Sequence, residues 1–192
     1  MNAKIVPVGV SARHIHLTRE HIDILFGVGY ELKPLKPLSQ PGQFAAEETV
    51  AIVGPKGRFD KVRILGPARR ASQIEISRTD AFQLGVDAPV RESGNIEGTP
   101  GMTVIGPAGE VALERGVIVA ARHIHFQTKE AAAWGIADKQ LLKVRVHGER
   151  PLVFEDVIAR VSDDFALDLH IDTDEANAAG VATGGRAEIV DA

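Results

Sequence analysis

Apolar runs of strand length recur along the whole chain and are separated by turn residues. Runs typical of strands occupy residues 5–10, 49–53, 59–65, 102–105, 110–113, 141–146, 153–161 and 187–190, and residues 166–172 alternate in a strand-like way. The turn sequence Gly-Pro-x-Gly predicts two hairpins, one joining 49–53 to 59–65 and one joining 102–105 to 110–113. Residues 31–48 contain three prolines and are expected to form an irregular excursion, and residues 92–101 a further loop.

A second pattern, which occurs four times, predicts short helices. Each copy begins with a threonine that we expect to cap the helix, carries an acid in its first turn, and reaches a glycine followed by valine or isoleucine. The copies lie at residues 18–28, 79–86, 128–136 and 173–181. Short helices among short strands favour small barrels capped by helices, because a doubly wound parallel sheet needs longer helices between its strands.

One pentapeptide occurs twice. Ala-Arg-His-Ile-His occupies residues 12–16 and again residues 121–125, and the two copies hold four of the seven histidines. A strand is predicted to enter each copy, and a helix and hairpins follow it. We therefore expect a mainly β fold with short helices, built by imperfect internal duplication as two small β-barrels capped by short α-helices.

Composition narrows the chemistry that the chain can perform. The 192 residues include no cysteine, which excludes disulfides, thiolate metal ligands and a cysteine nucleophile, and fits a reducing cytoplasm. No run approaches the ~20 apolar residues of a membrane span, and the N-terminus lacks a signal-peptide core. Residues 56–78 hold seven cations and two acids, which indicates either a solvated basic face or an anion site. Scarce aromatic residues argue against nucleic acid.

Each copy of the pentapeptide places two histidines one residue apart on a predicted strand. Side chains alternate along a strand, so both imidazoles face one side with Cα atoms about 6.5–7 Å apart, while Ile15 and Ile124 face a core. Two such rings can reach one metal ion at about 2.0–2.1 Å. A single His-x-His is as often structural as functional, but packing does not require the same polar pair twice. We therefore interpret each pair as half of a metal site.

A metal site needs a third ligand for each pair of histidines. His170 is the best candidate, because it lies in an alternating run between Asp168 and Asp172, whose carboxylates could orient its ring. Glu75, which stands between two isoleucines after the basic cluster, is a second candidate. The residues alone leave open which pair each of them completes.

Two arginines, Arg69 and Arg70, follow a Gly-Pro-Ala turn within the basic cluster. A guanidinium there could bind phosphate through its planar fork of donors. Metal ligands combined with an anion-binding arginine indicate Lewis-acid chemistry on a phosphoryl or acyl-phosphate group.

At these residues the chain resembles the PduL-type phosphotransacylases, also called phosphate propanoyltransferases. The resemblance rests on Val-Gly-Val-Ser-Ala-Arg-His-Ile-His-Leu at residues 8–17, the Gly-Pro-x-Arg that ends at Arg69, the Gln-x-Glu-x-Ser around Glu75 and the second pentapeptide, and it extends over residues 5–190. It implies a phosphate acyltransferase that interconverts a short-chain acyl-CoA (propanoyl-CoA or acetyl-CoA) plus phosphate with acyl phosphate plus CoA. It also implies two helix-capped barrels, one from residues 3–12 with 121–190 and one from residues 13–120.

The same resemblance implies the roles of individual residues. Arg69 would be the catalytic, phosphate-binding residue, Ser93 would lie in a loop near the site, and transfer would be direct, without a covalent acyl-enzyme. Two divalent metal ions, expected to be Zn²⁺, would be held by His14, His16 and Glu75 and by His123, His125 and His170. CoA would contact Ser11, Ala12, Arg13, Lys36, Arg63 and Asn177.

Two other functions fit the residues: a metal-dependent thioester or phosphoester hydrolase on the same barrel, and a non-catalytic module that binds CoA or metal. The first strand begins within about five residues of Met1, so we expect no microcompartment-targeting extension and a free enzyme of the bacterial cytoplasm. The expected partners are acyl-CoA, CoA and phosphate, without nucleic acid or membrane, in a homo-oligomer of two or more subunits.

Overall fold

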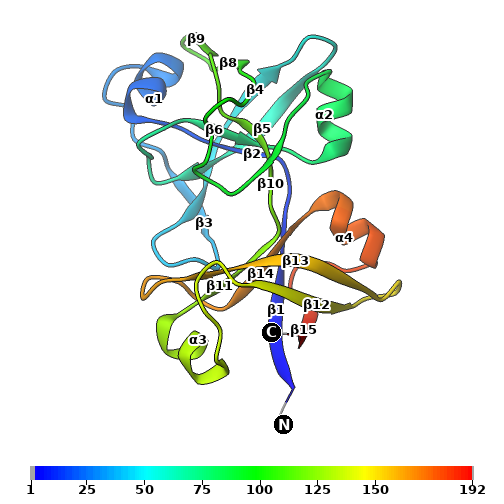
Figure 1. Cartoon of the computed structure of the whole chain (residues 1–192). Coiled ribbons are helices and arrows are strands. Elements are labelled where there is room, and N and C mark those ends of the chain that lie inside the picture. Colours follow the sequence, from blue (N-terminus) through cyan, green and yellow to red (C-terminus); the bar gives the residue numbers. More distant parts are fainter. Residues whose placement is uncertain (1–2, 192) are drawn as a thin grey trace. The chain divides into compact units, whose positions relative to one another are not determined.

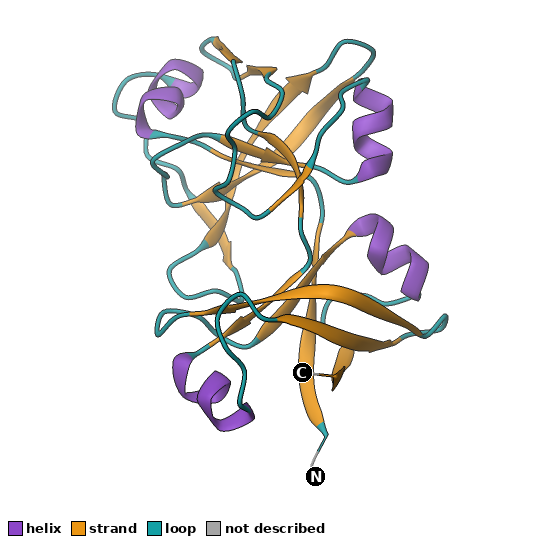
Figure 2. Cartoon of the chain, viewed as in Figure 1, coloured by secondary structure: helices purple, strands orange, loops and turns teal. Residues whose placement is uncertain are grey.

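A computed structural model describes residues 3–191 of the chain. Within this range the fold is mainly β with four short helices, as predicted (Figure 2). The chain divides into two units, which are described separately. The barrel unit consists of the described residues within Met1–Ser11, Ser39–Pro41 and Ala121–Ala192, and the central unit consists of Ala12–Leu38 and Gly42–Ala120. No helix in residues 3–191 has the length and apolar character needed to cross a membrane.

The barrel unit is a closed barrel of six strands (Figure 1). Neighbouring strands around it are β1 (Lys4–Ser11), β14 (Asp168–Asp172), β11 (His123–Phe126), β13 (Leu152–Val161), β12 (Leu141–His147) and β15 (Arg186–Asp191). Its core is aliphatic and contains the fully buried Ile124 and Phe126. Helices α3 (Thr128–Trp134) and α4 (Thr173–Ala179) add Ala131, Ala176 and Ala179 to that core.

The central unit is a curled, open sheet of nine strands. In spatial order these are β7 (Val90–Arg91), β10 (Val117–Ala120), β6 (Gln73–Glu75), β2 (His14–His16), β5 (Arg58–Gly66), β4 (Phe44–Val53), β8 (Met102–Ile105) and β9 (Glu110–Leu113), with β3 (Pro34–Pro37) paired to β4. This sheet is not a closed barrel: its path ends at one side in β7, which pairs with β10, and at the other in β9, which pairs with β8. Helices α1 (Arg19–Phe26) and α2 (Arg78–Leu84) contribute Ile22, Leu25, Ala81 and Leu84 to its core, which also holds Ile15.

The internal duplication is visible strand by strand. The order β10-β6-β2-β5-β4-β8 in the central unit matches β1-β14-β11-β13-β12-β15 in the barrel unit. Corresponding neighbours also pair in the same sense: β2 is antiparallel to β6 and parallel to β5, and β11 is antiparallel to β14 and parallel to β13. Strand β1 belongs to the barrel unit but leads into the first pentapeptide, which lies in the central unit. Strand β10 belongs to the central unit but leads into the second pentapeptide, which lies in the barrel unit.

The predicted irregular excursion at residues 31–48 contains two strand segments, β3 and the start of β4, so that prediction is wrong for these residues. Pro34 and Pro37 are tolerated because β3 lies off the main path of the sheet and pairs with β4 alone. Between the two strands, Ser39–Pro41 belongs to the barrel unit. There the side-chain amide of Gln40 donates to the Ala166 carbonyl at 3.0 Å and accepts from the Ala166 N–H at 3.2 Å.

The helix ends agree with the predicted glycines but not with most of the predicted caps. Thr18 caps α1, because its side chain accepts from the His21 N–H. The other three helices begin one or two residues earlier than the threonines indicate, with caps at Ser77, Gln127 and Asp172. The reason is the capping box, which places the cap three residues before an acid that accepts the cap's own N–H. Those acids are Asp80, Glu130 and Glu175.

Candidate functional site

The first triad of candidate metal ligands lies in the central unit, on β2 and β6. These strands pair antiparallel with His14 opposite Glu75, so the strand register places the carboxylate beside both rings of His14 and His16. The Nε2 atoms of His14 and His16 lie 3.4 Å and 3.8 Å from the Glu75 carboxylate oxygens. All three residues are buried. The structure thus brings together the three residues that the sequence resemblance groups as one ligand set.

Backbone carbonyls fix the orientation of both rings. The Nδ1 atom of His14 lies 2.9 Å from the Ala12 carbonyl, and that of His16 lies 3.2 Å from the Leu65 carbonyl. A carbonyl only accepts, so each Nδ1 carries the proton and donates it. In the neutral form of each ring, Nε2 therefore has the lone pair, and this is the tautomer that metal binding through Nε2 requires.

Burial and neighbouring charges set the protonation of this triad. Burial, followed by the charges of His14 and Arg69, lowers the pKa of His16 to about 3. Burial also acts to lower the pKa of His14, but the Glu75 carboxylate outweighs it and raises that pKa above its ordinary value. Burial acts to raise the pKa of Glu75, and the charge and hydrogen bond of His14 hold it well below its usual range. The site therefore offers an ionised carboxylate and a neutral His16 near pH 7.

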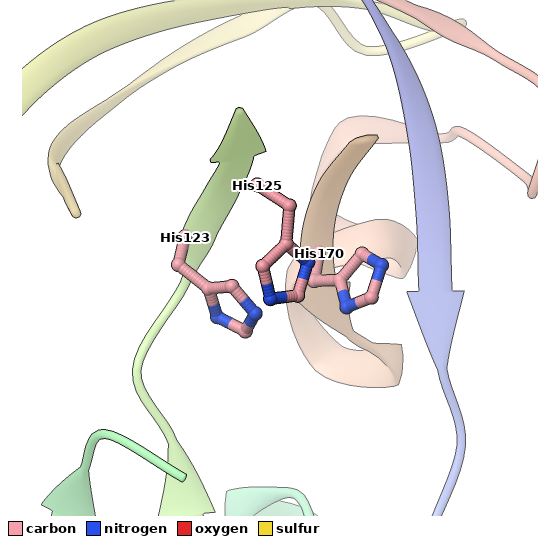
Figure 3. Close-up of side chains that lie close together, drawn as sticks. All are labelled: His123, His125 and His170. Atoms are coloured by element: carbon pink, nitrogen blue, oxygen red, sulfur yellow. The ribbon is translucent and has the colours of Figure 1, made fainter. Parts of the chain in front are cut away.

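The second triad lies in the barrel unit, on β11 and β14. These strands pair antiparallel with His123 opposite His170, and Figure 3 shows the three rings of His123, His125 and His170 close together. Their ring centroids are 4.6–5.1 Å apart. The Nδ1 atom of His123 lies 2.8 Å from the Ala121 carbonyl, which repeats the contact of His14. His170 is partly exposed, so this triad is more open than the first.

A carboxylate orients the ring of His170. Its Nε2 atom lies 3.0 Å from Oδ2 of Asp168, so Nε2 donates and Nδ1 keeps the free lone pair. Ser39 Oγ lies 3.4 Å from the same Nε2. Asp168 thus lies where the alternating sequence pattern predicts it. The matching prediction for Asp172 is wrong, because its side chain accepts from the Glu175 N–H as the cap of α4.

Both triads have a donor set that fits a divalent metal ion. In each, the three donor atoms lie within 4.8 Å of one another. The Nδ1 atom of His125 is buried without a hydrogen-bond partner, and burial with the charge of His123 lowers its pKa to about 2. A buried, neutral imidazole with an unused nitrogen is costly unless it binds something. Sets of two histidines with a carboxylate, and of three histidines, are both typical of catalytic zinc.

Arg69 lies beside the first triad, and a polar network ties it to Glu75. Its backbone N–H donates to the Leu17 carbonyl at 2.8 Å, directly after β2. Its guanidinium donates to Ser93 Oγ at 3.3 Å and to Gln43 Oε1 at 3.4 Å. Its charge is among the causes that lower the pKa of His16. A cation is thus positioned next to the buried ligand cluster.

Gln73 and Ser93 complete this network. The Gln73 amide donates to Glu75 Oε1 at 2.6 Å and to Ser93 Oγ at 2.9 Å, and the Ser93 hydroxyl donates to Glu75 Oε1 at 2.9 Å. The Gly94 N–H fixes the amide by donating to Gln73 Oε1 at 2.7 Å. Sequence reasoning missed Gln73, although its spacing of two from Glu75 on one strand places both on the same face.

The residues expected to contact CoA are distributed over both units. Ser11 ends β1 and Asn177 is exposed on α4 in the barrel unit, whereas the other four lie in the central unit. There Lys36 is exposed on β3, and Arg63 is the register partner of His14 and donates to the carbonyls of residues 46 and 47. The Ala12 carbonyl orients His14. The guanidinium of Arg13 forms an ion pair with the buried carboxylate of Asp80.

Gly9 is expected to be essential for the orientation of His170. Gly9 on β1 pairs with His170, and a Cβ atom at this position would lie 2.8 Å from Asp168 Oδ2. Gly9→Ala should therefore displace the carboxylate and weaken metal binding at the second triad by about tenfold, the scale of losing an outer-shell partner. A metal titration measures the change. The double variant Gly9→Ala/Asp168→Ala should lose no more affinity than Asp168→Ala alone, and full additivity would contradict this steric explanation.

Ser93 is expected to stabilise the ionised Glu75. Ser93→Ala removes a hydroxyl that donates to a buried carboxylate, which should lower the free energy of unfolding of the metal-free protein by about 1.5–3 kcal/mol. Urea denaturation measures it. Ser162→Ala, whose hydroxyl accepts a local hydrogen bond from the Asp164 N–H, is the control and should cost less. Equal losses in the two variants would show that the contact with Glu75 contributes little.

Fold and site together define a class: a duplicated, helix-capped β protein with two histidine-rich triads, one of them fully buried and with an arginine beside it. Residues 7–182 match the family model described as phosphate propanoyltransferase. Proteins named phosphate propanoyltransferase are similar along nearly the whole chain. That of Thermotoga maritima is 59% identical over 96% of this chain and 88% of its own length, and that of Leptotrichia buccalis is 53% identical over 92% and 84%. The chain therefore belongs to the phosphate propanoyltransferase family, a family of acyltransferases.

Proposed function

We propose that the protein catalyses direct acyl transfer between CoA and phosphate, with propanoyl-CoA or acetyl-CoA as the acyl donor. The observation that carries the proposal beyond family membership is the network around Glu75. One hydroxyl there, that of Ser93, joins the guanidinium of Arg69 to Glu75 of the first triad of candidate metal ligands. Phosphate is a dianion near neutral pH, so a site that activates it has to supply concentrated positive charge.

Two divalent ions, which we expect to be Zn²⁺, would be held by the two triads and would act there as Lewis acids for the phosphate oxygens and the CoA sulfur. The chain's own contribution is positional. The guanidinium fork of Arg69 can bind two phosphate oxygens and reduce their repulsion with the incoming thioester. Lys36, which is exposed, and Arg63, which is partly buried, are proposed to contact CoA together with Ser11, Ala12 and Asn177, because cations suit its phosphates.

The proposed transfer needs no covalent intermediate with the protein. With both substrates bound, a phosphate oxygen attacks the carbonyl carbon of the thioester. A C–O bond forms as the C–S bond breaks, and the sulfur leaves with the bonding electron pair as the CoA thiolate. The chain has no cysteine to accept an acyl group, which agrees with direct transfer. Orientation of the two substrates by fixed side chains is then the main source of rate enhancement.

A CoA-release assay tests the proposal. Acetyl-, propanoyl- and butanoyl-CoA are each incubated with the purified protein, with and without phosphate, and with and without a chelator. We expect CoA release that requires phosphate, is abolished by the chelator and yields acyl phosphate in equal amount. Release without phosphate would indicate a hydrolase instead. Binding of CoA and metal without turnover of any of the three substrates would indicate a non-catalytic module.

A further inference from the structure

The arginine of each repeated pentapeptide forms an ion pair with an acid in its own unit. In the central unit, Nη2 of Arg13 lies 2.5 Å from Oδ1 of Asp80. In the barrel unit, Nη1 of Arg122 lies 2.9 Å from Oε1 of Glu175. The side chains of the acids are 4% and 19% exposed and those of the arginines 39% and 32%, so in each pair the carboxylate is the partner shielded from water.

Each acid also accepts a hydrogen bond from the backbone N–H two residues beyond the third metal-ligand candidate. Asp80 and Glu175 are the capping-box acids of α2 and α4. The second oxygen of Asp80 accepts the Ser77 N–H at 3.4 Å, and that of Glu175 accepts the Asp172 N–H at 3.0 Å. Ser77 and Asp172 each lie two residues beyond the third ligand, Glu75 or His170. One carboxylate therefore bridges the pentapeptide and the strand that carries the third ligand.

The same arginine also reaches the strand on the other side of the histidines. The guanidinium carbon of Arg13 lies 4.0 Å from the ring centroid of Phe59 on β5, and that of Arg122 lies 5.3 Å from that of Phe154 on β13. Nε of Arg122 also donates to the Glu155 carbonyl on β13 at 2.8 Å. In both units the histidine strand lies between the other two strands, so each arginine spans all three.

We propose that Arg13–Asp80 and Arg122–Glu175 are positioning pairs that hold the histidine strand and the third-ligand strand in the register at which the three donors converge. The inference rests on the proposed metal-binding function. It gives Arg13 a different role from the CoA contact expected from the resemblance. A CoA contact would not explain why the second pentapeptide carries an arginine with the same ion pair to a capping-box acid and the same contact with an aromatic ring, whereas a shared architectural role explains both copies.

The duplication allows each unit to serve as the control for the other. Arg13→Met and Arg122→Met keep much of the side-chain volume and remove the charged fork. Zinc competition against a chromophoric chelator should show that Arg13→Met weakens the first triad, and Arg122→Met the second, each by on the order of tenfold, while the other triad keeps its affinity. Cobalt substitution should show a changed visible absorption band for the affected triad alone.

Four further variants separate positioning from general stability. Arg13→Lys and Arg122→Lys keep the charge and should restore part of the affinity. Arg13→Met/Asp80→Asn retains a cap acceptor, leaves no unpaired buried charge, and should show the same loss of affinity as Arg13→Met if the bridge is what matters. Arg115→Met, which removes the exposed pair with Glu97 in the central unit, should leave both triads unchanged.

The outcomes distinguish this inference from the proposed function. If the unaltered protein binds no metal at the triads, the metal part of the proposed function fails, and the positioning role, which rests on it, is overturned with it. If it binds two ions and the methionine variants keep both affinities and both cobalt spectra, the positioning role is overturned and the proposed function stands. If Arg13→Met lowers CoA affinity while the first triad keeps its metal affinity, Arg13 is a CoA contact and the positioning role is likewise overturned.

Discussion

Arg69→Ala should lower kcat/KM for phosphate-dependent CoA release by about 10²- to 10³-fold, the scale of removing one preorganised charge-stabilising donor. The guanidinium lies beside the buried triad of His14, His16 and Glu75, and its charge already influences the pKa of His16. Because Arg69 is not one of the metal-ligand candidates, both ions should remain bound in the variant. Steady-state kinetics at several phosphate concentrations, with metal analysis of the same sample, measure both expectations.

Arg70→Ala is the matched control, since Arg70 is the exposed neighbour in the same loop. It removes an equal charge from the basic cluster and should change kcat/KM little. A general electrostatic role for the cluster would instead affect the two variants alike. Normal phosphate-dependent turnover in Arg69→Ala would contradict the assignment of Arg69 as the phosphate-binding residue.

His170→Ala should remove one metal ion per chain and reduce turnover by at least about a hundredfold, since Lewis-acid assistance is worth several kcal/mol. The side chain supplies the only donor of the second triad that comes from β14; the other two come from β11. Losing it leaves His123 and His125 as a two-ligand pair, which is too few for a stable zinc site. Metal content by elemental analysis and the CoA-release rate measure the two effects.

His147→Ala provides the control for the loss of a histidine in the same unit. His147 lies on β12, is half exposed, and has its Nε2 atom 3.6 Å from the Glu188 carboxylate. Metal content and turnover should both be retained in this variant. If His170→Ala keeps two ions and normal turnover, the second triad is not a functional metal site, whatever its geometry.

Local signals in the sequence were sufficient for most of the secondary structure. The glycine stops of the helices, the two Gly-Pro-x-Gly hairpins and the inward-facing Ile15 and Ile124 are present as predicted, because turn chemistry and side-chain alternation act over a few residues. The caps of α2 and α4 were misplaced because threonine competes with serine and aspartate as a cap. The position of the acid decides which residue is the cap, because a capping box needs an acid three residues after the cap. Ser77 with Asp80 and Asp172 with Glu175 both have this spacing in the sequence, so the sequence contains the signal for the correct caps.

The edge strand β3 shows a second limit of local reasoning. Its prolines indicate irregular structure when read alone, and they are compatible with a strand only where one side needs no partner. That condition depends on β3 having β4 as its neighbour, a contact that the local pattern does not contain. The need for glycine at position 9 is likewise invisible in the local sequence. It arises because the Asp168 side chain, on a strand far away in the chain, occupies the space that a Cβ atom of residue 9 would need.

The sequence by itself determined the mainly β class, the duplication and the two His-x-His pairs, because each follows from periodicity or from an exact repeat. It also singled out Glu75 and His170 as candidates for the third ligand, but the residues alone did not say which pair each one would complete. Only the tertiary structure decided that, through the pairing of β2 with β6 and of β11 with β14. Strand pairing is set by hydrogen bonds and core packing between segments far apart in the chain, which no local pattern encodes.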